Sequence, residues 1–405
     1  MPLFEGERHE PLAEIVWDEA RARSVMERIA ADVERSFNEG SLWPVHPLDR
    51  SAERPPDSMK PLYFGATGVI WALTYLAAAG ATPCTTNFLP TVRALSARHR
   101  EDIERHEGVG KYLGPAINSF MTGETGMLLL EWKLAPSDRL ATKIYKNMEA
   151  TIGDPRGLVW GSAGSMLAVH YMQRQTSGSQ WSDLYCRLFR ALWDALEYDE
   201  TASCSLWTSQ LYGVTERRLG ALHGFTSNMA SIARGASFLD ESERSAVFRQ
   251  MEKTLRATAL SDDDYVNWPV SVEFQKQPFV QYCNGAPGVV SALGVGDHLS
   301  PYLIELFKKA GELVWAAGPL VKLPVLCHGT PGNGFAFLRL FVLTGNDEWL
   351  HRARLFAMHA ITQNERALEK YGQRKYSLWT GDLGLAVYLW NCVRATAEFP
   401  ILDAL

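Results

Sequence analysis

The chain has 405 residues, of which 46% are hydrophobic and 21% are charged, and its formal net charge is −6. This is ordinary globular composition, and the acidic balance argues against a protein that binds nucleic acid. No apolar run reaches the roughly 18 residues of a membrane span, and the acidic N-terminus lacks the apolar core of a signal peptide. We therefore expect a cytoplasmic protein without a transmembrane segment.

One short pattern recurs along the chain: two glycines spaced as G-x-x-G, followed by an apolar run typical of a helix. In the fourth copy Ser227 replaces the second glycine. A single G-x-x-G is a weak signal, but seven copies that each open an apolar run indicate an internal repeat. The copies are FGATGVIWAL from Phe64, MTGETGMLLL from Met121, WGSAGSMLAV from Trp160, HGFTSNMASI from His223, NGAPGVVSAL from Asn284, HGTPGNGFAF from His328 and TGDLGLAVYL from Thr380.

The segments between the glycine motifs have the periodicity of amphipathic helices, with many charges on one side. Clear examples span 13–37, 86–106 and 347–371. Ser300 followed by Pro301 is a typical helix start, because serine caps the helix and proline fits its first position. The chain thus alternates charged helices with more apolar ones.

This alternation predicts an all-α fold, in which apolar helices form an inner ring and amphipathic helices an outer ring. We expect one domain over residues 1–405, an α/α toroid of seven inner and seven outer helices, with the repeats at about 63–392. The glycines would let loops approach the axis at one end and leave backbone N–H groups exposed there. A functional site is expected at that end.

Two longer irregular stretches, 40–61 and 260–282, interrupt the pattern. Long loops in a compact domain are often functional lids, although each stretch is also consistent with a simple solvated connection.

Six cysteines are too few for a disulfide scaffold in a chain of this length. A buried cysteine is most often an inert core residue, and we interpret Cys186 and Cys392 in this way. Cys84 and Cys204 are expected in loops.

Cys283 and Cys327 differ from the other cysteines, because each stands two residues before the first glycine of a motif. His328 follows Cys327 directly. Adjacent repeats are neighbours in a toroid, so these three side chains should converge near the axis. Two thiolates and one imidazole form a suitable zinc set, and three protein ligands leave one coordination position open, as in catalytic sites.

Seven such repeats, with cysteine before the fifth glycine motif and Cys-His before the sixth, resemble the lanthionine synthetase C family over roughly 63–392. The most specific piece is CHGTPGNGFAFL from Cys327. Together with YSLWTGDLGLAVYL from Tyr376, it is more similar to the stand-alone C-like proteins than to the peptide cyclases of lantibiotic clusters. The resemblance implies the same toroid of seven inner and seven outer helices.

The resemblance also implies zinc and the addition of a thiol to dehydroalanine or dehydrobutyrine, which gives a thioether. Its partners would be a peptide with a dehydroamino acid, glutathione, or both. Zinc suits this chemistry because a free cysteine thiol, with a pKa of about 8.5, is mostly protonated at neutral pH. His223 matches the family histidine before the fourth motif and would act as general acid or base. His170 and His359 lie within predicted helices and are interpreted as structural.

Two basic residues are candidate substrate contacts. Lys322 lies five residues before Cys327, where a lysine in the stand-alone relatives resembles a contact for the glutathione carboxylate. Arg374 precedes the seventh motif and is a second candidate. An exposed lysine or arginine is more often simply solvated.

The sequence departs from the bacterial cyclases at two positions, where Gly157 replaces an aspartate and Phe279 an arginine. These departures put peptide cyclisation in doubt more than zinc binding, and they leave open a zinc-bearing protein that binds glutathione or a peptide without turnover. Other α/α barrels fit less well. Prenyltransferase β subunits bind zinc through Asp, Cys and His, and sugar-processing barrels use paired carboxylates and six hairpins.

Overall fold

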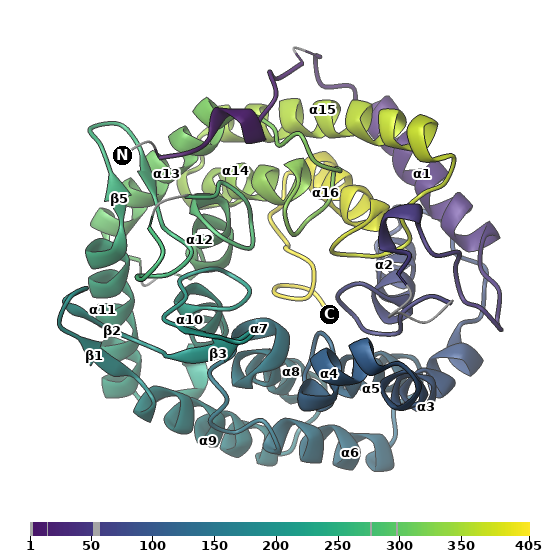
Figure 1. Ribbon diagram of the computed structural model, residues 1–405, viewed down its shortest axis with the longest axis horizontal. Coiled ribbons are helices and arrows are strands. Elements are labelled where there is room, and N and C mark those ends of the chain that lie inside the picture. Colours follow the sequence, from purple (N-terminus) through teal and green to yellow (C-terminus); the bar gives the residue numbers. More distant parts are fainter. Residues whose placement is uncertain (1–2, 14, 52–56, 276–277, 297–298) are drawn as a thin grey trace.

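The computed structural model describes residues 1–405 except 1–2, 14, 52–56, 276–277 and 297–298. Its long helices form two concentric rings, and the predicted all-α toroid of seven inner and seven outer helices is confirmed in these residues (Figure 1). The inner helices are α2 (Ala66–Ala78), α5 (Glu124–Leu134), α8 (Ser162–Gln175), α10 (Phe225–Arg234), α12 (Ala286–Leu293), α14 (Thr330–Thr344) and α16 (Asp382–Arg394). The outer helices are α1 (Glu19–Arg35), α3 (Leu89–Arg105), α6 (Asp138–Glu149), α9 (Gln180–Asp194), α11 (Glu241–Thr258), α13 (Pro301–Ala317) and α15 (Asp347–Tyr371).

Shorter elements connect the rings. Two further helices are α4 (Glu107–Leu113) and α7 (Gly157–Trp160), and three antiparallel hairpins pair β1 (Glu197–Asp199) with β2 (Cys204–Leu206), β3 (Ser209–Leu211) with β4 (Val214–Glu216), and β5 (Leu260–Ser261) with β6 (Val266–Asn267). Cys204 is buried in β2, so its assignment to a loop is wrong. Among the described residues, none of the helices has the length and hydrophobicity needed to cross a membrane.

The two rings begin their helices in different ways. Outer helices are amphipathic, and five of them begin with a side chain that accepts a hydrogen bond from a backbone N–H group of the first turn. Each inner helix begins directly after a glycine, without such a side-chain cap, and Gly161, which precedes α8, also ends the short helix α7. The outer-helix caps are Asp18, Ser137, Asp240, Ser300 and Asn346.

The glycine motifs allow the preceding loop to fold back over the first turn of each inner helix. A Cβ atom added at Gly332 would lie 1.8 Å from the carbonyl oxygen of Leu326, so no other residue fits there without movement. The same loops satisfy the first N–H groups of the helices. Ala66 N, for example, donates to Met59 O at 2.8 Å. The expectation that the glycines leave these N–H groups exposed is therefore wrong, because loop carbonyls occupy them.

A chain of backbone hydrogen bonds joins the residues that stand two positions before the first glycine of five motifs. Cys283 N donates to Cys327 O at 3.0 Å, and Cys327 N donates to Trp379 O at 3.0 Å. Trp379 N then donates to Tyr63 O at 3.2 Å, and Tyr63 N donates to Met121 O at 2.9 Å. The repeat register therefore places these five residues side by side around the axis.

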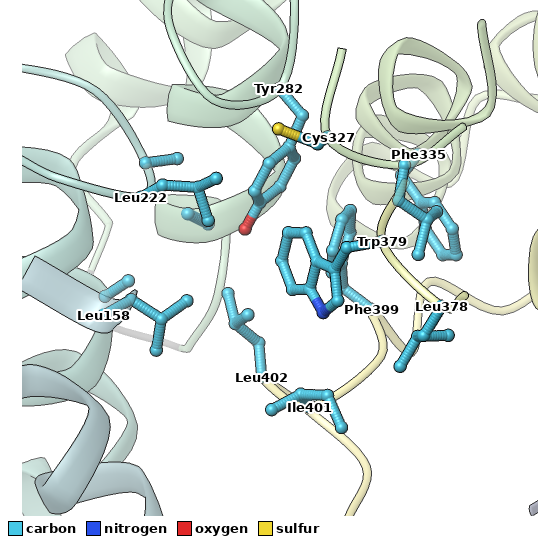
Figure 2. Packing of buried hydrophobic residues seen from close by; sticks show 14 of the residues in the cluster. Leu158, Leu222, Tyr282, Cys327, Phe335, Leu378, Trp379, Phe399, Ile401 and Leu402 are labelled. Atoms are coloured by element: carbon cyan, nitrogen blue, oxygen red, sulfur yellow. The ribbon is translucent and has the colours of Figure 1, made fainter. Parts of the chain in front are cut away.

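The centre of the inner ring is filled by the chain that follows α16 (Figure 1). The Phe399 ring stacks on the Tyr282 ring with centroids 4.2 Å apart, and it lies 5.4 Å from the Trp379 ring. Ile401 and Leu402 continue this apolar cluster beside Trp379 (Figure 2). The chain segment that carries Phe399 thus supports the residues next to both predicted metal ligands, Cys283 and Cys327.

Candidate metal centre

The structure brings Cys283 and Cys327 together. They immediately precede the glycine turns of α12 and α14, which pack against each other. The two thiols hydrogen bond to one another, and Gln281 Nε2 donates to Cys283 Sγ at 3.1 Å. Neither cysteine forms a disulfide, so both sulfur atoms are available as ligands.

The surroundings of the two thiols favour a single negative charge on Cys283. The hydrogen bond from Cys327 lowers the pKa of the Cys283 thiol. Burial acts in the opposite direction, but the hydrogen bond from Gln281 and the positive charge of Lys322 lower the pKa further, and together these effects outweigh burial. The pKa of Cys327 is raised well above its ordinary value, because its hydrogen bond to Cys283 and burial both disfavour a second thiolate. A bound cation would be needed to hold both sulfur atoms as thiolates.

His328 is neutral, as a metal ligand must be, because burial lowers its pKa to about 4 and the charges of Lys322 and Lys375 act in the same direction. The donor types therefore fit zinc. In the part of the chain that the structure describes, however, no group of three His, Cys, Asp or Glu side chains is close enough to hold a metal ion. The two thiols lie together, and His328 would have to move closer to them to complete a three-ligand site.

Tyr63 is a site residue that the sequence interpretation missed. It stands two residues before the first glycine motif, in the same register as both cysteines, and its hydroxyl group hydrogen bonds to Cys327. Burial and the negative charge expected on the two sulfur atoms raise the pKa of Tyr63, so the phenol stays protonated and donates to sulfur. The repeat register alone points to this position, because Tyr63 has the same offset from its glycine motif as Cys283 and Cys327.

His223 precedes α10 and faces two aromatic side chains. Its Nε2 atom lies 3.5 Å from Tyr212 Oη, and its ring centroid is 5.8 Å from that of Trp160. The pKa of His223 is lowered to about 4, mainly by burial and further by the positive charge of Arg218. The main chain of Arg156 has a smaller, opposite effect. The imidazole is therefore neutral near pH 7 and can accept a proton.

The two departures from the bacterial cyclases have different settings. Gly157 has a φ of +81°, and a Cβ atom there would lie 2.9 Å from His223 Cα, so no aspartate fits at this position without movement of the loop. The nearby Asp154 is paired with Arg156 at 2.6 Å. Phe279 is covered by the Arg8 guanidinium, 4.4 Å from its ring centroid.

The two candidate substrate contacts are placed differently. Lys322 is exposed and lines a cavity of about 470 Å³ together with His328. Arg374 is buried, and its Nη1 atom donates to Asn364 Oδ1 at 2.8 Å and lies 3.2 Å from Asp382 Oδ2. These bonds give Arg374 a structural role, and its contact with a substrate stays a prediction.

Three neighbouring cavities share lining residues, among them Tyr63 and His328. The first, of about 340 Å³, is lined by Tyr63, Phe64 and His223. The second, of about 390 Å³, shares Tyr63 and Phe64 with the first and is also lined by His328. The third is the 470 Å³ cavity of Lys322, which shares His328 with the second. A substrate could thus extend from His223 past Tyr63 and His328 to Lys322.

Part of this chain is similar in sequence to known proteins. A family model described as lanthionine synthetase C-like protein matches residues 199–403. Glutathione S-transferase LANCL1 of Danio rerio is 30% identical over 145 residues, 34% of each protein. LanC-like protein GCL1 of Arabidopsis thaliana is 34% identical over 130 residues, 31% of this chain and 30% of that protein. The matched part of the chain spans only about a third of the length of these relatives.

The solved structure of a nisin cyclase has the same overall fold. It superposes with a TM-score of 0.57, covers 95% of this chain and 99% of its own, and is 15% identical in sequence. Identity this low supports a shared fold and nothing finer. The family match covers just over half of the residues and includes both cysteines, His223 and His328. The chain therefore belongs to the lanthionine synthetase C-like family.

Proposed function

We propose that the protein activates a thiol at a zinc ion held by Cys283, Cys327 and His328, and adds it to a dehydroalanine or dehydrobutyrine residue. The observation that carries this proposal is the pair of neighbouring thiols at equivalent repeat positions, next to Tyr63, which lines two of the cavities. Zinc at this place would supply the Lewis acidity that converts a bound thiol to its thiolate at neutral pH.

The chain's own residues handle the proton. In the net reaction a thiol S–H bond breaks, a bond forms between sulfur and the β-carbon, and the α-carbon receives one proton. The thiol releases one proton and the α-carbon takes up one, so no oxidant or reductant is required. His223, neutral and at the edge of the first cavity, accepts a proton and returns it to the α-carbon, while the Tyr63 hydroxyl group orients Cys327.

Glutathione is the thiol that best fits the basic side of the site. It carries two carboxylates, and the 470 Å³ cavity is lined by Lys322, Lys370 and Lys375. Lys375 is paired with Asp49 at 2.8 Å, whereas no carboxylate among the described residues lies within ion-pair distance of Lys322. A peptide cysteine remains the other possible thiol.

The test is direct. Zinc-loaded protein would be incubated with glutathione and a dehydrobutyrine-containing peptide, and the peptide mass would be followed. A gain of one glutathione supports the proposal. No gain with glutathione or with a peptide thiol, while one zinc stays bound per chain, would point to a protein that binds glutathione or a peptide without turnover.

His223→Asn should lower the rate of thiol addition by roughly a hundredfold or more, which is typical for loss of a general base. Glutathione binding, measured by calorimetry, should be unchanged. Because the neutral imidazole is the active form and its pKa is about 4, the wild-type rate should rise with pH through about 4 and show no His223 step near 6.5. An unchanged rate in the variant would rule out this role.

Lys322→Gln should raise KM for glutathione about threefold to tenfold with little change in kcat, because an exposed charge pair contributes modest binding energy. Lys308→Gln is the matched control, since Lys308 is also partly exposed but lies on outer helix α13. Steady-state kinetics on both variants would check this. Equal effects of the two substitutions would contradict a specific contact.

A further inference from the structure

We propose that the 340 Å³ cavity beside His223 is the acceptor subsite, and that it takes an apolar, preferably aromatic, side chain next to the dehydroamino acid. This inference rests on the proposed function, because it assigns the acceptor to one side of the same site. The substrate class would then be peptides in which the reactive double bond is flanked by a residue such as phenylalanine.

The wall of this cavity is uncharged and largely aromatic. None of the described residues that line it is Asp, Glu, Lys or Arg, and its one titratable imidazole, His223, is neutral near pH 7. Tyr112, Trp160 and Tyr212 contribute aromatic surface, and Val109, Leu113 and Val159 contribute aliphatic surface. Such a wall gains free energy when it covers an apolar side chain, and it offers no partner to a charged one.

The opposite side of the site has a different character. Lys322, Arg366, Lys370 and Lys375 line the 470 Å³ cavity, where Glu10 is the single carboxylate among the described lining residues. The two environments meet through the middle cavity, which is lined by both Tyr63 and His328. This division assigns the anionic thiol to the basic side and the acceptor to the apolar side.

The position of the apolar cavity suits the electrophile. Tyr63 lines the cavity and hydrogen bonds to Cys327, while His223 lines it from another motif. A double bond held between them would have sulfur on one side and the proton carrier on the other. The volume is near the lower end of the roughly 300–1,000 Å³ of small-ligand pockets, so it suits one side chain with its reactive neighbour rather than a folded partner.

The mouth of the cavity carries two exposed tyrosines. Tyr112 on α4 is 48% exposed, and Tyr212 in the β3–β4 turn is 59% exposed. Tyr212 has a φ of +55°, which is uncommon for a residue other than glycine, and its ring lies 5.4 Å from that of Trp160. Tyrosine suits a rim that contacts a peptide, because one end is apolar and the other stays hydrated.

The experiment compares two dehydroalanine peptides that differ only in the residue next to the dehydroalanine, phenylalanine or serine. Both would compete for glutathione addition by the zinc-loaded protein, and products would be quantified by mass. We expect the phenylalanine peptide to be favoured roughly tenfold or more, as burial of one aromatic side chain allows. Tyr112→Asp should reduce this preference severalfold, and Tyr302→Asp, at an exposed tyrosine on α13, should not.

Binding separates this inference from the proposed function. The same peptides with alanine in place of dehydroalanine would be titrated into the protein by calorimetry. If no addition occurs but the phenylalanine peptide binds more tightly, and Tyr112→Asp removes that difference, the subsite stands and the proposed reaction fails. Equal use and equal binding of the two peptides, or a preference that Tyr112→Asp leaves unchanged in a folded protein, would overturn the subsite.

Discussion

Replacement of Cys327 by alanine should lower the rate of thioether formation at least about a hundredfold and reduce bound zinc to well below one per chain. Changes outside the ligand set already cost about 10- to 100-fold in many metal sites, so loss of a ligand should cost more. The fold should survive, because Cys327 joins its neighbours through main-chain hydrogen bonds to Cys283 and Trp379 that alanine keeps. Peptide mass, metal analysis and circular dichroism would measure the three outcomes.

The matched control for this variant is Cys392→Ala. Cys392 is also buried on the inner ring, in α16, and burial raises the pKa of its thiol to about 12. It should therefore be an inert core residue, and its replacement should leave zinc content and thiol addition near wild-type values. If Cys327→Ala retained both zinc and activity, the assignment of the metal centre would be wrong.

Periodicity and repeat register were sufficient to predict most of the fold. The glycine motifs mark the starts of the inner helices, and the helix predicted over 347–371 has the same bounds as α15, Asp347–Tyr371. The pairing of Cys283 with Cys327 also follows from register, because equivalent positions of neighbouring repeats meet around the axis. These features depend on backbone geometry that every repeat shares.

Features that depend on individual side chains could not be predicted in this way. The sequence alone suggests that Arg374 is free to contact a substrate, but in the structure its guanidinium group is bound by Asp382 and Asn364. Compared with the bacterial cyclases, the sequence lacks a carboxylate at Gly157, and the structure shows that the His223 backbone leaves no room for one. Repeat register places Tyr63 at the position equivalent to both cysteines, but its contact with Cys327 depends on the link between the first and sixth motifs through Trp379. For Gly157 and Tyr63 the decisive contact is with a distant part of the chain, and for Arg374 it is with two side chains that only the fold of the local loop brings within reach.

Asp403→Asn should destabilise the folded state by about 3 to 5 kcal/mol, which is typical when one partner of a buried ion pair is removed. The Asp403 carboxylate lies 2.7 Å from Arg234 Nη2 and 2.5 Å from Arg339 Nη2, and both arginine side chains are at most 10% exposed. Asparagine keeps the shape but leaves two buried positive charges uncompensated. The exposed pair of Glu305 and Lys308 is the control, because Glu305→Gln should cost less than about 1 kcal/mol.

The effect of Asp403→Asn should depend on pH in a defined direction. Burial disfavours the charged carboxylate, but Arg234 and Arg339 outweigh it and hold the pKa of Asp403 below its ordinary value. Its stabilising contribution is therefore complete above the unfolded pKa of about 3.9 and is lost as pH falls through the lower folded value. Urea unfolding should show a large difference between wild type and variant at pH 7 that shrinks below about pH 4. Because Asp403 Oδ2 also accepts from Phe399 N, and Phe399 stacks on Tyr282 beside Cys283, the variant should bind zinc more weakly as well. A difference in stability that stayed constant with pH would show that the charge of Asp403 is not what holds this segment in the ring.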